Sequence, residues 1–330
     1  MRKSPYHKYA LLDNPFRFEA GGFEAGQREG LNLLNVKQEE DYELEDAFFD
    51  TLEKNRKTIL QILGQEGAGK TERLLLLVER AKEEAASCCY LNAGGKGGFV
   101  LVAEILDALS KPKFRSKRKR FGIFTPGWLR ELRGVRRWFL ADGEDERKIG
   151  EDRVSAAIAG ALNESSPSFL LLDDFEAGID LRVVRLLQAV FEKVVRGVLI
   201  AIAAESGHGQ SWIAKKVELR GFNEREAELC VAKRLLAERT VSEKLDPLYP
   251  FTPAAVRKVN ESVRGNPKRL LEALAVILDA GVARRAEIID EEFVLRTNFS
   301  QKFDQKGFAE TILCNLCVFR SKASAFNRVQ

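Results

Sequence analysis

The residues with the clearest chemical purpose lie at positions 64–71, where the sequence reads GQEGAGKT. This run fits the pattern G-x-x-x-x-G-K-[ST], in which glycines let backbone N–H groups curl around a chain of phosphates. Lys70 would neutralise the β and γ phosphates, and Thr71 would coordinate Mg²⁺. The pattern therefore predicts a site for ATP and Mg²⁺, with contacts from Gly64, Gly67, Ala68, Gly69, Lys70, Thr71 and Glu72.

Two acids at positions 173 and 174 are natural partners of such a loop. They follow the apolar run 169–172 (FLLL), which is typical of a central parallel strand covered on both faces. Carboxylates at the end of such a strand lie where parallel sheets bind ligands. We expect Asp173 to hold the Mg²⁺ and Asp174 to polarise the attacking water, with Glu176 as a stand-in. Taken in isolation, the two acids would more simply cap a helix.

These side chains need a sheet and a helix to position them. The run 58–63 (TILQIL) predicts a buried strand directly before the loop, and helix formers follow the loop from Glu72 to Ala81. Further apolar strands are expected near 88–92 and over 197–204. A strand, a glycine loop and a helix in this order are what phosphate binding at a helix N-terminus requires. The predicted fold class is therefore α/β, with a parallel sheet.

The order of these motifs resembles that of the AAA+ ATPases. The loop, the strand before Asp173, the strand over 197–204 and the run 264–269 (RGNPKR) follow one another as in that family. Within it, the chain resembles the branch that holds the origin-recognition and transposition-regulator ATPases. The run 13–16 (DNPF) resembles the N-terminal segment that packs near the adenine in that branch. The resemblance covers about residues 14–295 and implies a P-loop NTPase core of AAA+ type with a C-terminal all-helical lid.

The resemblance also implies roles for polar residues outside the loop. Glu205 and Ser206 occupy the sensor 1 position, where a side chain contacts the γ-phosphate or orients the water. Lys268 and Arg269 match the sensor 2 motif, whose cation reaches over the nucleotide from the lid. The family usually has arginine directly after the Gly-Asn-Pro, where this chain has Lys268, so either residue can be the equivalent. A solvent-facing pair at a helix start is the alternative.

Two departures from the family pattern bear on hydrolysis. Asp174 stands where many members have glutamate, which is one methylene longer. The usual stretch for an arginine finger, 207–216, contains no arginine, which leaves Lys215, Lys216 or Arg220 to serve a neighbouring subunit. Because such an arginine is worth about 10³ or more in rate, the chain could bind ATP well and hydrolyse it slowly.

A strongly basic insertion is expected at 111–150, between helices predicted at 99–110 and 152–163. Its first part, 111–138, holds eleven lysines or arginines and one acid, so it carries +10 while the rest of the chain carries −6. Cations interleaved with aromatic residues suit contact with DNA or RNA, and relatives in the same branch often contact DNA through an insertion here. The candidates are Lys117, Arg118, Lys119, Arg120, Arg133, Arg136 and Arg137.

Two other interpretations of the insertion stay open. Its cations could bind an anionic membrane surface or an acidic partner protein. They could also belong to a solvated loop that merely neutralises the acidic run 142–146. In that case the acids would fold back on the cations in an autoinhibitory or purely structural arrangement.

The chain divides into three parts on this interpretation. Residues 1–221 form the nucleotide-binding core, residues 222–296 the lid and residues 297–330 a C-terminal tail. We expect a tail of this length to be too short for the winged-helix domain of a replication initiator. The lid helices are expected at 223–238, 253–263, 267–279 and 287–295, and Asn223 and Glu226 predict a capping box for the first of them.

Composition excludes several other classes of protein. With 45% hydrophobic and 31% charged residues and five cysteines among 330, the chain is neither disordered nor collagen-like nor a disulfide scaffold. No apolar run approaches the ~18 residues of a membrane span, so we expect a cytoplasmic protein with reduced thiols. Cys314 and Cys317 form a C-x-x-C, but the sequence offers no second such pair to complete a zinc site.

The predicted function is an ATPase that couples ATP binding and hydrolysis to oligomerisation on DNA or to remodelling of DNA. It would act as a homo-oligomer or with a partner ATPase. The alternative is an ATP-gated switch or scaffold that recruits a protein partner and hydrolyses slowly or not at all. Another P-loop enzyme, such as a kinase or an ABC transporter subunit, is a third possibility, although no LSGGQ-like stretch occurs.

Overall fold

The computed structural model describes residues 4–17, 36–111, 127–141, 151–175, 181–205, 213–240 and 245–297. The chain forms two compact units. One comprises Gly30–Gly221, and the other combines Met1–Glu29 with Phe222–Gln330.

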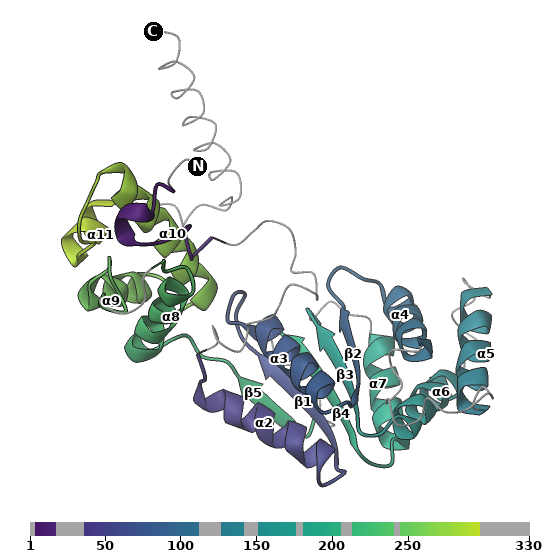
Figure 1. Cartoon of the computed structure of the whole chain (residues 1–330). Coiled ribbons are helices and arrows are strands. Elements are labelled where there is room, and N and C mark those ends of the chain that lie inside the picture. Colours follow the sequence, from purple (N-terminus) through teal and green to yellow (C-terminus); the bar gives the residue numbers. More distant parts are fainter. Residues whose placement is uncertain are drawn as a thin grey trace, which may run out of the picture. The chain divides into compact units, whose positions relative to one another are not determined.

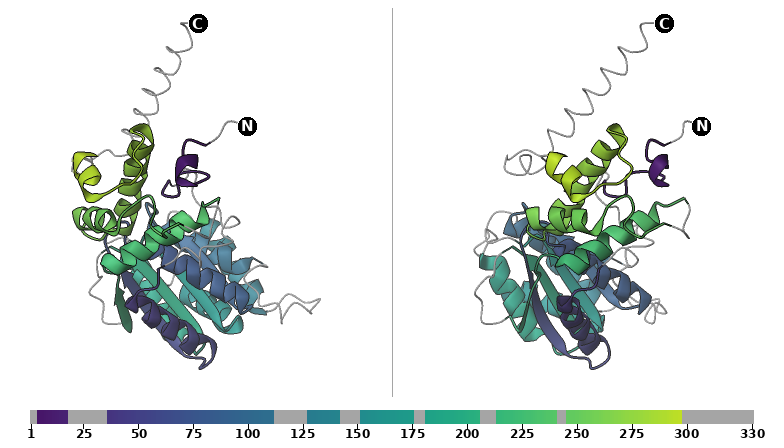
Figure 2. Two further views of the ribbon diagram at one scale, coloured as in Figure 1. Left: turned by 60° about the vertical axis from the view of Figure 1, so that its left-hand side comes forward. Right: turned by 90° about the vertical axis from the view of Figure 1, so that its left-hand side faces the viewer.

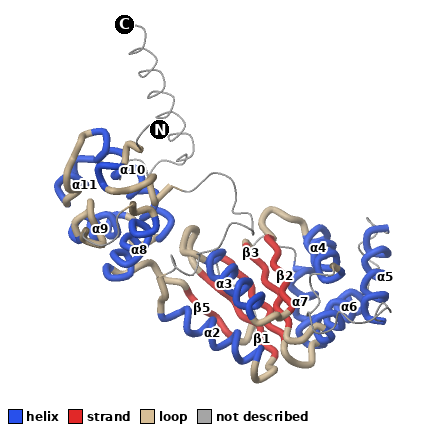
Figure 3. The backbone as a smooth tube through the Cα atoms, viewed as in Figure 1, coloured by secondary structure: helices blue, strands red, loops and turns tan. Residues whose placement is uncertain are grey.

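A five-stranded parallel sheet lies at the centre of the first unit (Figure 3). The strand order is β2-β3-β4-β1-β5. Every residue of β3 and β4 is buried, as expected for strands with helices on both faces. This sheet confirms the predicted α/β fold class and adds a short edge strand, β5, that the sequence does not predict. The strands are β1 (Lys57–Leu63), β2 (Ser87–Asn92), β3 (Ser168–Asp173), β4 (Val198–Ala204) and β5 (Lys215–Glu218).

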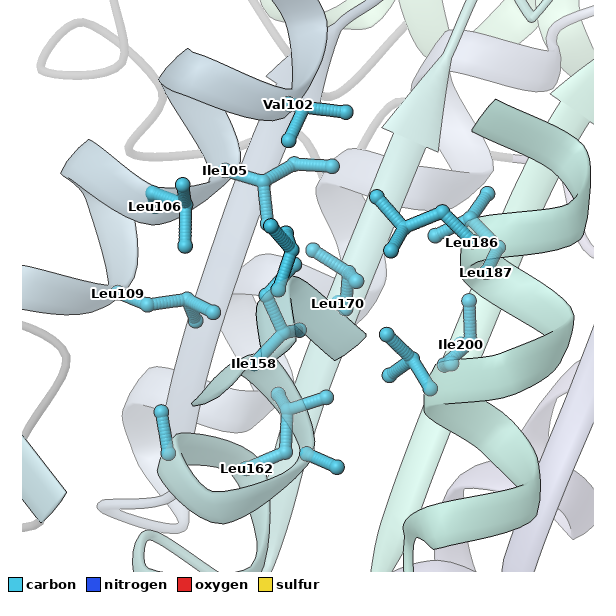
Figure 4. Close-up of a cluster of buried hydrophobic side chains, with 14 of the residues drawn as sticks. Val102, Ile105, Leu106, Leu109, Ile158, Leu162, Leu170, Leu186, Leu187 and Ile200 are labelled. Carbon is cyan, nitrogen blue, oxygen red and sulfur yellow. The ribbon is translucent and has the colours of Figure 1, made fainter. Parts of the chain in front are cut away.

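Helices cover both faces of the sheet (Figures 1 and 2). The helices α2 (Glu39–Leu52) and α3 (Lys70–Glu83) pack on one face. The other face is covered by α4 (Gly98–Ser110), α6 (Glu151–Glu164) and α7 (Leu181–Lys193). Figure 4 shows how side chains from these three helices point toward Leu170 of β3 and Ile200 of β4, in the larger of the two apolar layers.

The insertion contains a helix that belongs to this core. Helix α5 (Gly127–Ala141) packs against α4 and α6, and the ring of Phe139 stacks on Phe99 of α4 with centroids 4.4 Å apart. Its inner residues are spaced by three or four, the period of a helix with one apolar face. The buried ones are Leu129, Leu132, Val135 and Phe139.

The side chain of Gln61 is a polar group inside the sheet. Gln61 of β1 is fully buried beside Ile202 of β4 and Lys216 of β5, and neither amide atom has a hydrogen-bond partner among the described residues. A buried polar group in this state costs about 1–3 kcal/mol of stability. Removing it should therefore stabilise the core.

We expect Gln61→Leu to raise the free energy of unfolding by about 1–3 kcal/mol, because leucine has a similar volume and no polar atoms to desolvate. The transition temperature measured by circular dichroism should rise by a few degrees. Gln61→Glu is the matched control and should lower it, since burying an unpaired charge costs more. A lower transition temperature for the leucine variant would contradict this account of Gln61.

The second unit is helical in its described part. Asn223 and Glu226 form the predicted capping box, in which each side chain accepts a hydrogen bond from the other residue's backbone N–H at 2.9 Å. Asn266 caps the longest of the described helices with a single hydrogen bond, which its side chain accepts from the N–H of Arg269. The helices are α8 (Glu224–Ala237), α9 (Pro253–Ser262), α10 (Pro267–Ala283) and α11 (Glu291–Thr297).

The described N-terminal residues, 4–17, pack within this helical unit, whereas the sequence-based division places them in the core domain. The carboxylate of Asp279 on α10 accepts hydrogen bonds from the hydroxyl of Tyr6 at 2.6 Å and from the amide of Asn14 at 2.8 Å, and it pairs with Arg17 at 2.8 Å. Burial and the bond to Asp279 raise the pKa of Tyr6 above its ordinary value, so its hydroxyl stays a donor. Phe16 is buried against Phe251.

Candidate nucleotide-binding site

The loop between β1 and α3 has the backbone that phosphate binding requires. Gly67 and Gly69 have φ angles of +81° and +94°, in the left-handed region that favours glycine. The loop also folds closely on itself, because a Cβ on Gly64 would lie only 3.0 Å from that of Ala68. No described side chain caps the N-terminus of α3, which begins at Lys70. The positive end of the α3 dipole therefore meets the loop, as in anion sites.

The side chain of Lys70 lies inside this loop and is 7% exposed. Its Nζ donates to the carbonyl oxygens of Gly64 at 2.6 Å and Gln65 at 3.0 Å. The ammonium is thus held at the loop's centre, where phosphate oxygens are the natural further acceptors. Thr71 is exposed on the first turn of α3, and Glu72 follows it.

Asp173 is fully buried at the end of β3. One carboxylate oxygen accepts a hydrogen bond from the hydroxyl of Tyr90 at 2.7 Å, and the other accepts from the N–H of Asp174 at 3.0 Å. Two donors fix the carboxylate in one orientation. A carboxylate and a hydroxyl are hard oxygen ligands of the kind that Mg²⁺ prefers, so the chemistry of Asp173 and Thr71 fits the predicted metal.

Asp174 is exposed and has a φ of +50°, which is uncommon for a residue with a side chain. Its carboxylate accepts a hydrogen bond from the amide of Asn92 at 2.6 Å, and Asn92 in turn accepts from the N–H of Gly94 at 2.9 Å. Gly94 leaves room for this arrangement, because a Cβ there would lie 3.0 Å from the Cβ of Asp174. Tyr90 and Asn92 are therefore site residues that the sequence analysis does not identify.

The strand register brings these groups to one edge of the sheet. Asp173 pairs with Asn92, and Leu63 pairs with Ala204, directly before Glu205. Because all five strands are parallel, their carboxyl ends share the edge where such sheets bind ligands. Strand β4 lies between β1 and β3, so two strand spacings of about 4.8 Å separate the loop from the acids. That separation leaves room for phosphates and a metal ion. Glu205 is exposed at this edge, and Ser206 lies outside the described residues.

The proposed sensor 2 residues lie in the helical unit. Lys268 and Arg269 are exposed in the first turn of α10, after the capping residue Asn266. Their approach to the nucleotide stays a prediction.

Two of the three cations considered for a neighbour's site are engaged within this chain. Lys215 donates to the backbone carbonyl of Glu43 at 3.0 Å, and Arg220 pairs with the carboxylate of Glu40 at 3.1 Å. Both acids belong to α2. Lys216 is exposed on β5.

Comparison with solved structures identifies the fold. The chain is similar to Cdc6p from Pyrobaculum aerophilum, with a TM-score of 0.54 and 16% identity over 92% of this chain and 74% of that one. It is also similar to the ORC2 protein of Aeropyrum pernix in ADPNP–ADP complexes, with a TM-score of 0.52 and 16% identity over 86% and 70% of the two chains. The fold is that of the AAA+ ATPases. The predicted resemblance to the origin-recognition branch is confirmed for the fold.

Sequence comparison adds no relative to this result. The sequence matches no family model, and no curated protein matches it.

The outer face of α5 carries a row of exposed cations. Arg133 and Arg137 are exposed, and so is Arg130, which the sequence analysis leaves out and which lies on the same face about one turn before Arg133. Arg136 instead pairs with Asp107 of α4 at 2.7 Å. Hydrogen bonding to Lys111, with Arg136 nearby, lowers the pKa of Asp107. Lys117, Arg118, Lys119 and Arg120 lie outside the described residues.

The described part of the chain offers no other candidate metal site, and two of its cysteines are held as thiols. No group of three or more His, Cys, Asp or Glu side chains that could hold a metal occurs there. Burial raises the pKa of the Cys89 thiol to about 12 and raises that of Cys88 as well, so both stay protonated at neutral pH. Cys314 and Cys317 are not among the described residues.

None of the described helices has the length and apolar character that crossing a membrane requires.

Proposed function

We propose that this chain binds ATP with Mg²⁺ at the loop 64–71 and hydrolyses it to ADP and phosphate. The observation that carries the proposal is the arrangement at one sheet edge, where the loop around Lys70 follows β1 and the fixed carboxylates of Asp173 and Asp174 follow β3, with only β4 between the two parallel strands. A titration calorimeter measures the binding, and release of phosphate measures the turnover. No heat with Mg·ATP and folded protein would reject the proposal.

Each site residue has a distinct task in this proposal. The Lys70 ammonium and the N–H groups at the start of α3 bind the phosphates, and Thr71 and Asp173 would hold Mg²⁺, which would neutralise phosphate charge. Asp174 orients and polarises the water whose oxygen bonds to the γ-phosphorus as the bond to the β–γ bridging oxygen breaks. Glu205 and Ser206 contact the γ-phosphate or this water. Lys268 or Arg269 approaches from the helical unit.

We also propose that the chain contacts DNA through the insertion. The support is the row formed by Arg130, Arg133 and Arg137, which spans about 10 Å along α5 at 1.5 Å per residue. Arginines in such a row can contact successive phosphates of one strand. Phosphate contacts position a protein on a duplex and carry no sequence information directly. We therefore expect binding with little dependence on sequence.

Changing Arg130, Arg133 and Arg137 together to glutamine should weaken binding to duplex DNA and reduce its salt dependence. Each lost phosphate contact lowers the slope of log K against log salt by about 0.9, so three contacts lower it by about 3. Fluorescence anisotropy with a labelled duplex at several salt concentrations gives this slope. A control with Arg56, Arg185 and Arg196 changed to glutamine removes the same charge from other exposed positions. An unchanged slope in the α5 variant would reject this interface.

A second candidate function is an ATP-gated switch or scaffold with slow hydrolysis. It is favoured by the contacts that Lys215 and Arg220 make with α2 of their own chain. Arg220 is the arginine among the three candidate fingers, and it is already paired with Glu40. Turnover per chain should then stay low at every protein concentration. Turnover that rises steeply with concentration would favour a site completed by a second copy or by a partner ATPase.

We also propose that the protein is a cytoplasmic oligomer, with a helical lid at residues 222–296 and a C-terminal tail at residues 297–330.

A further inference from the structure

A buried arginine lies directly beside the phosphate loop. Arg73 is on α3, three residues after Lys70, and its side chain is 2% exposed. Its Nε donates to one carboxylate oxygen of Asp41 at 3.0 Å. Its Nη2 donates to the side-chain oxygen of Gln38 at 2.8 Å and to the other oxygen of Asp41 at 3.3 Å. The guanidinium fork is thus fixed from two sides by the start of α2.

The same guanidinium packs against the last glycine of the loop. A Cβ on Gly69 would lie 2.6 Å from Nη1 of Arg73, so this nitrogen occupies the space next to Gly69. The backbone N–H of Arg73 also donates to the carbonyl oxygen of Gly69 at 3.1 Å. Gly69 is the left-handed residue whose turn presents Lys70. Arg73 therefore restricts the part of the loop on which the position of Lys70 depends.

The partners of Arg73 are themselves held in place. Asp41 and Gln38 form the capping box of α2, in which the carboxylate of Asp41 accepts from the N–H of Gln38 at 2.8 Å. The neighbouring Glu40 pairs with Arg220, two residues before the helical unit begins at Phe222. The first turn of α2 thus connects the loop to the end of the core.

We propose that Arg73 is a positioning residue for ATP binding, which shapes the phosphate loop before nucleotide arrives and does not contact the nucleotide. This inference rests on the proposed function. A buried ion pair adds little net stability compared with apolar residues of similar volume, so stability alone does not account for it. Arginine makes a planar fork that fixes several partners at once, whereas lysine offers a single point charge. A conservative change therefore separates the geometry from the charge.

The chain offers a matched control for this test. Arg80 lies two turns further along α3 and also joins α2, through its ion pair with Glu45. Arg73→Lys and Arg80→Lys each keep the charge and weaken one link between the same two helices. Only the first link adjoins the loop.

We expect Arg73→Lys to weaken ATP binding about tenfold, the size of effect seen when partners that orient binding groups are removed. Turnover at saturating ATP should stay within about twofold, because Asp173 and Asp174 keep their own partners. Arg80→Lys should leave both values within about twofold of the wild type. Asp41→Asn removes the charge on the other side of the ion pair and should reproduce the Arg73→Lys result. It replaces Arg73→Lys in the test if Arg73→Lys does not fold.

Hydrogen exchange in nucleotide-free protein gives an independent readout. The backbone amides of residues 67–71 should exchange faster in Arg73→Lys than in the wild type. Their exchange rates should be the same in Arg80→Lys as in the wild type. Wild-type affinity together with wild-type exchange in Arg73→Lys would overturn the inference, as would an equal loss in Arg80→Lys. If the wild type itself binds no ATP, the proposed function fails, and the exchange rates still decide whether Arg73 holds the loop.

Discussion

Replacing Lys70 with alanine is expected to abolish measurable ATP binding. The variant loses the buried ammonium at the centre of the loop, together with its bonds to the carbonyls of Gly64 and Gln65. Hydrogen bonds to charged groups are each worth about 1.5–3 kcal/mol, so losing two bonds to phosphate oxygens weakens binding by about 100-fold or more. Titration calorimetry with Mg·ATP measures this loss.

The control for this variant lies on the same helix. Lys82→Ala removes a lysine from the last turn of α3, away from the loop, and should leave ATP affinity within about twofold. Circular dichroism should show that both variants fold. An affinity of Lys70→Ala within about tenfold of the wild type would mean that the loop does not bind the triphosphate as we describe.

Asp174→Asn should remove turnover and preserve binding. The amide has nearly the same shape and can still accept a hydrogen bond from Asn92, so the site keeps its geometry. It carries no negative charge to polarise the attacking water, and loss of such a group typically costs about 10²–10⁴ in rate. Phosphate release and calorimetry, run on the same preparation, separate the two effects.

Asp152→Asn is the control for that experiment. Asp152 is an exposed carboxylate on α6 that pairs with Lys193 on α7, outside the proposed site. Its loss should change neither turnover nor affinity. If Asp174→Asn hydrolyses ATP as fast as the wild type, another group orients the water, and Glu205 is the next candidate.

The elements around the loop can be predicted because their signals are local. The sequence has a short apolar run, then the glycine loop with Lys70, then a run of residues that favour helix, without interruption. The apolar run before Asp173 marks a buried strand for the same reason. The capping box at Asn223 and Glu226 needs only four adjacent positions, and the structure shows it with both hydrogen bonds.

The contacts that hold the site could not be predicted from one sequence. Tyr90 and Asp173 are 83 positions apart, Asn92 and Asp174 are 82 apart, and Arg73 and Asp41 are 32 apart. These pairs meet because β2 lies beside β3 and α2 beside α3. Nothing in the spacing of the residues specifies which strand neighbours which.

Helix α5 shows a different difficulty. The positive charge of the insertion identifies a basic region but does not show which of its cations are exposed. The buried residues Leu129 and Leu132 are three positions apart, which is the spacing of residues on one face of a helix. That spacing separates the outward Arg130 and Arg133 from Arg136, which pairs with Asp107. The net charge of a segment therefore identifies a basic region, and only the helical period indicates which of its cations face outward.

The hydrogen bonds and the ion pair that join residues 4–17 to Asp279 affect how the two units could be produced separately. A gene fragment that starts at Phe222 would lack the chain that covers Phe251 and supplies Tyr6 and Asn14 to α10. Fusing residues 4–17 behind residue 297 through a flexible linker would restore that cover on a single continuous polypeptide. The same rearrangement would leave residues 36–221 as an uninterrupted module. Circular permutation thus suits this molecule better than simple truncation.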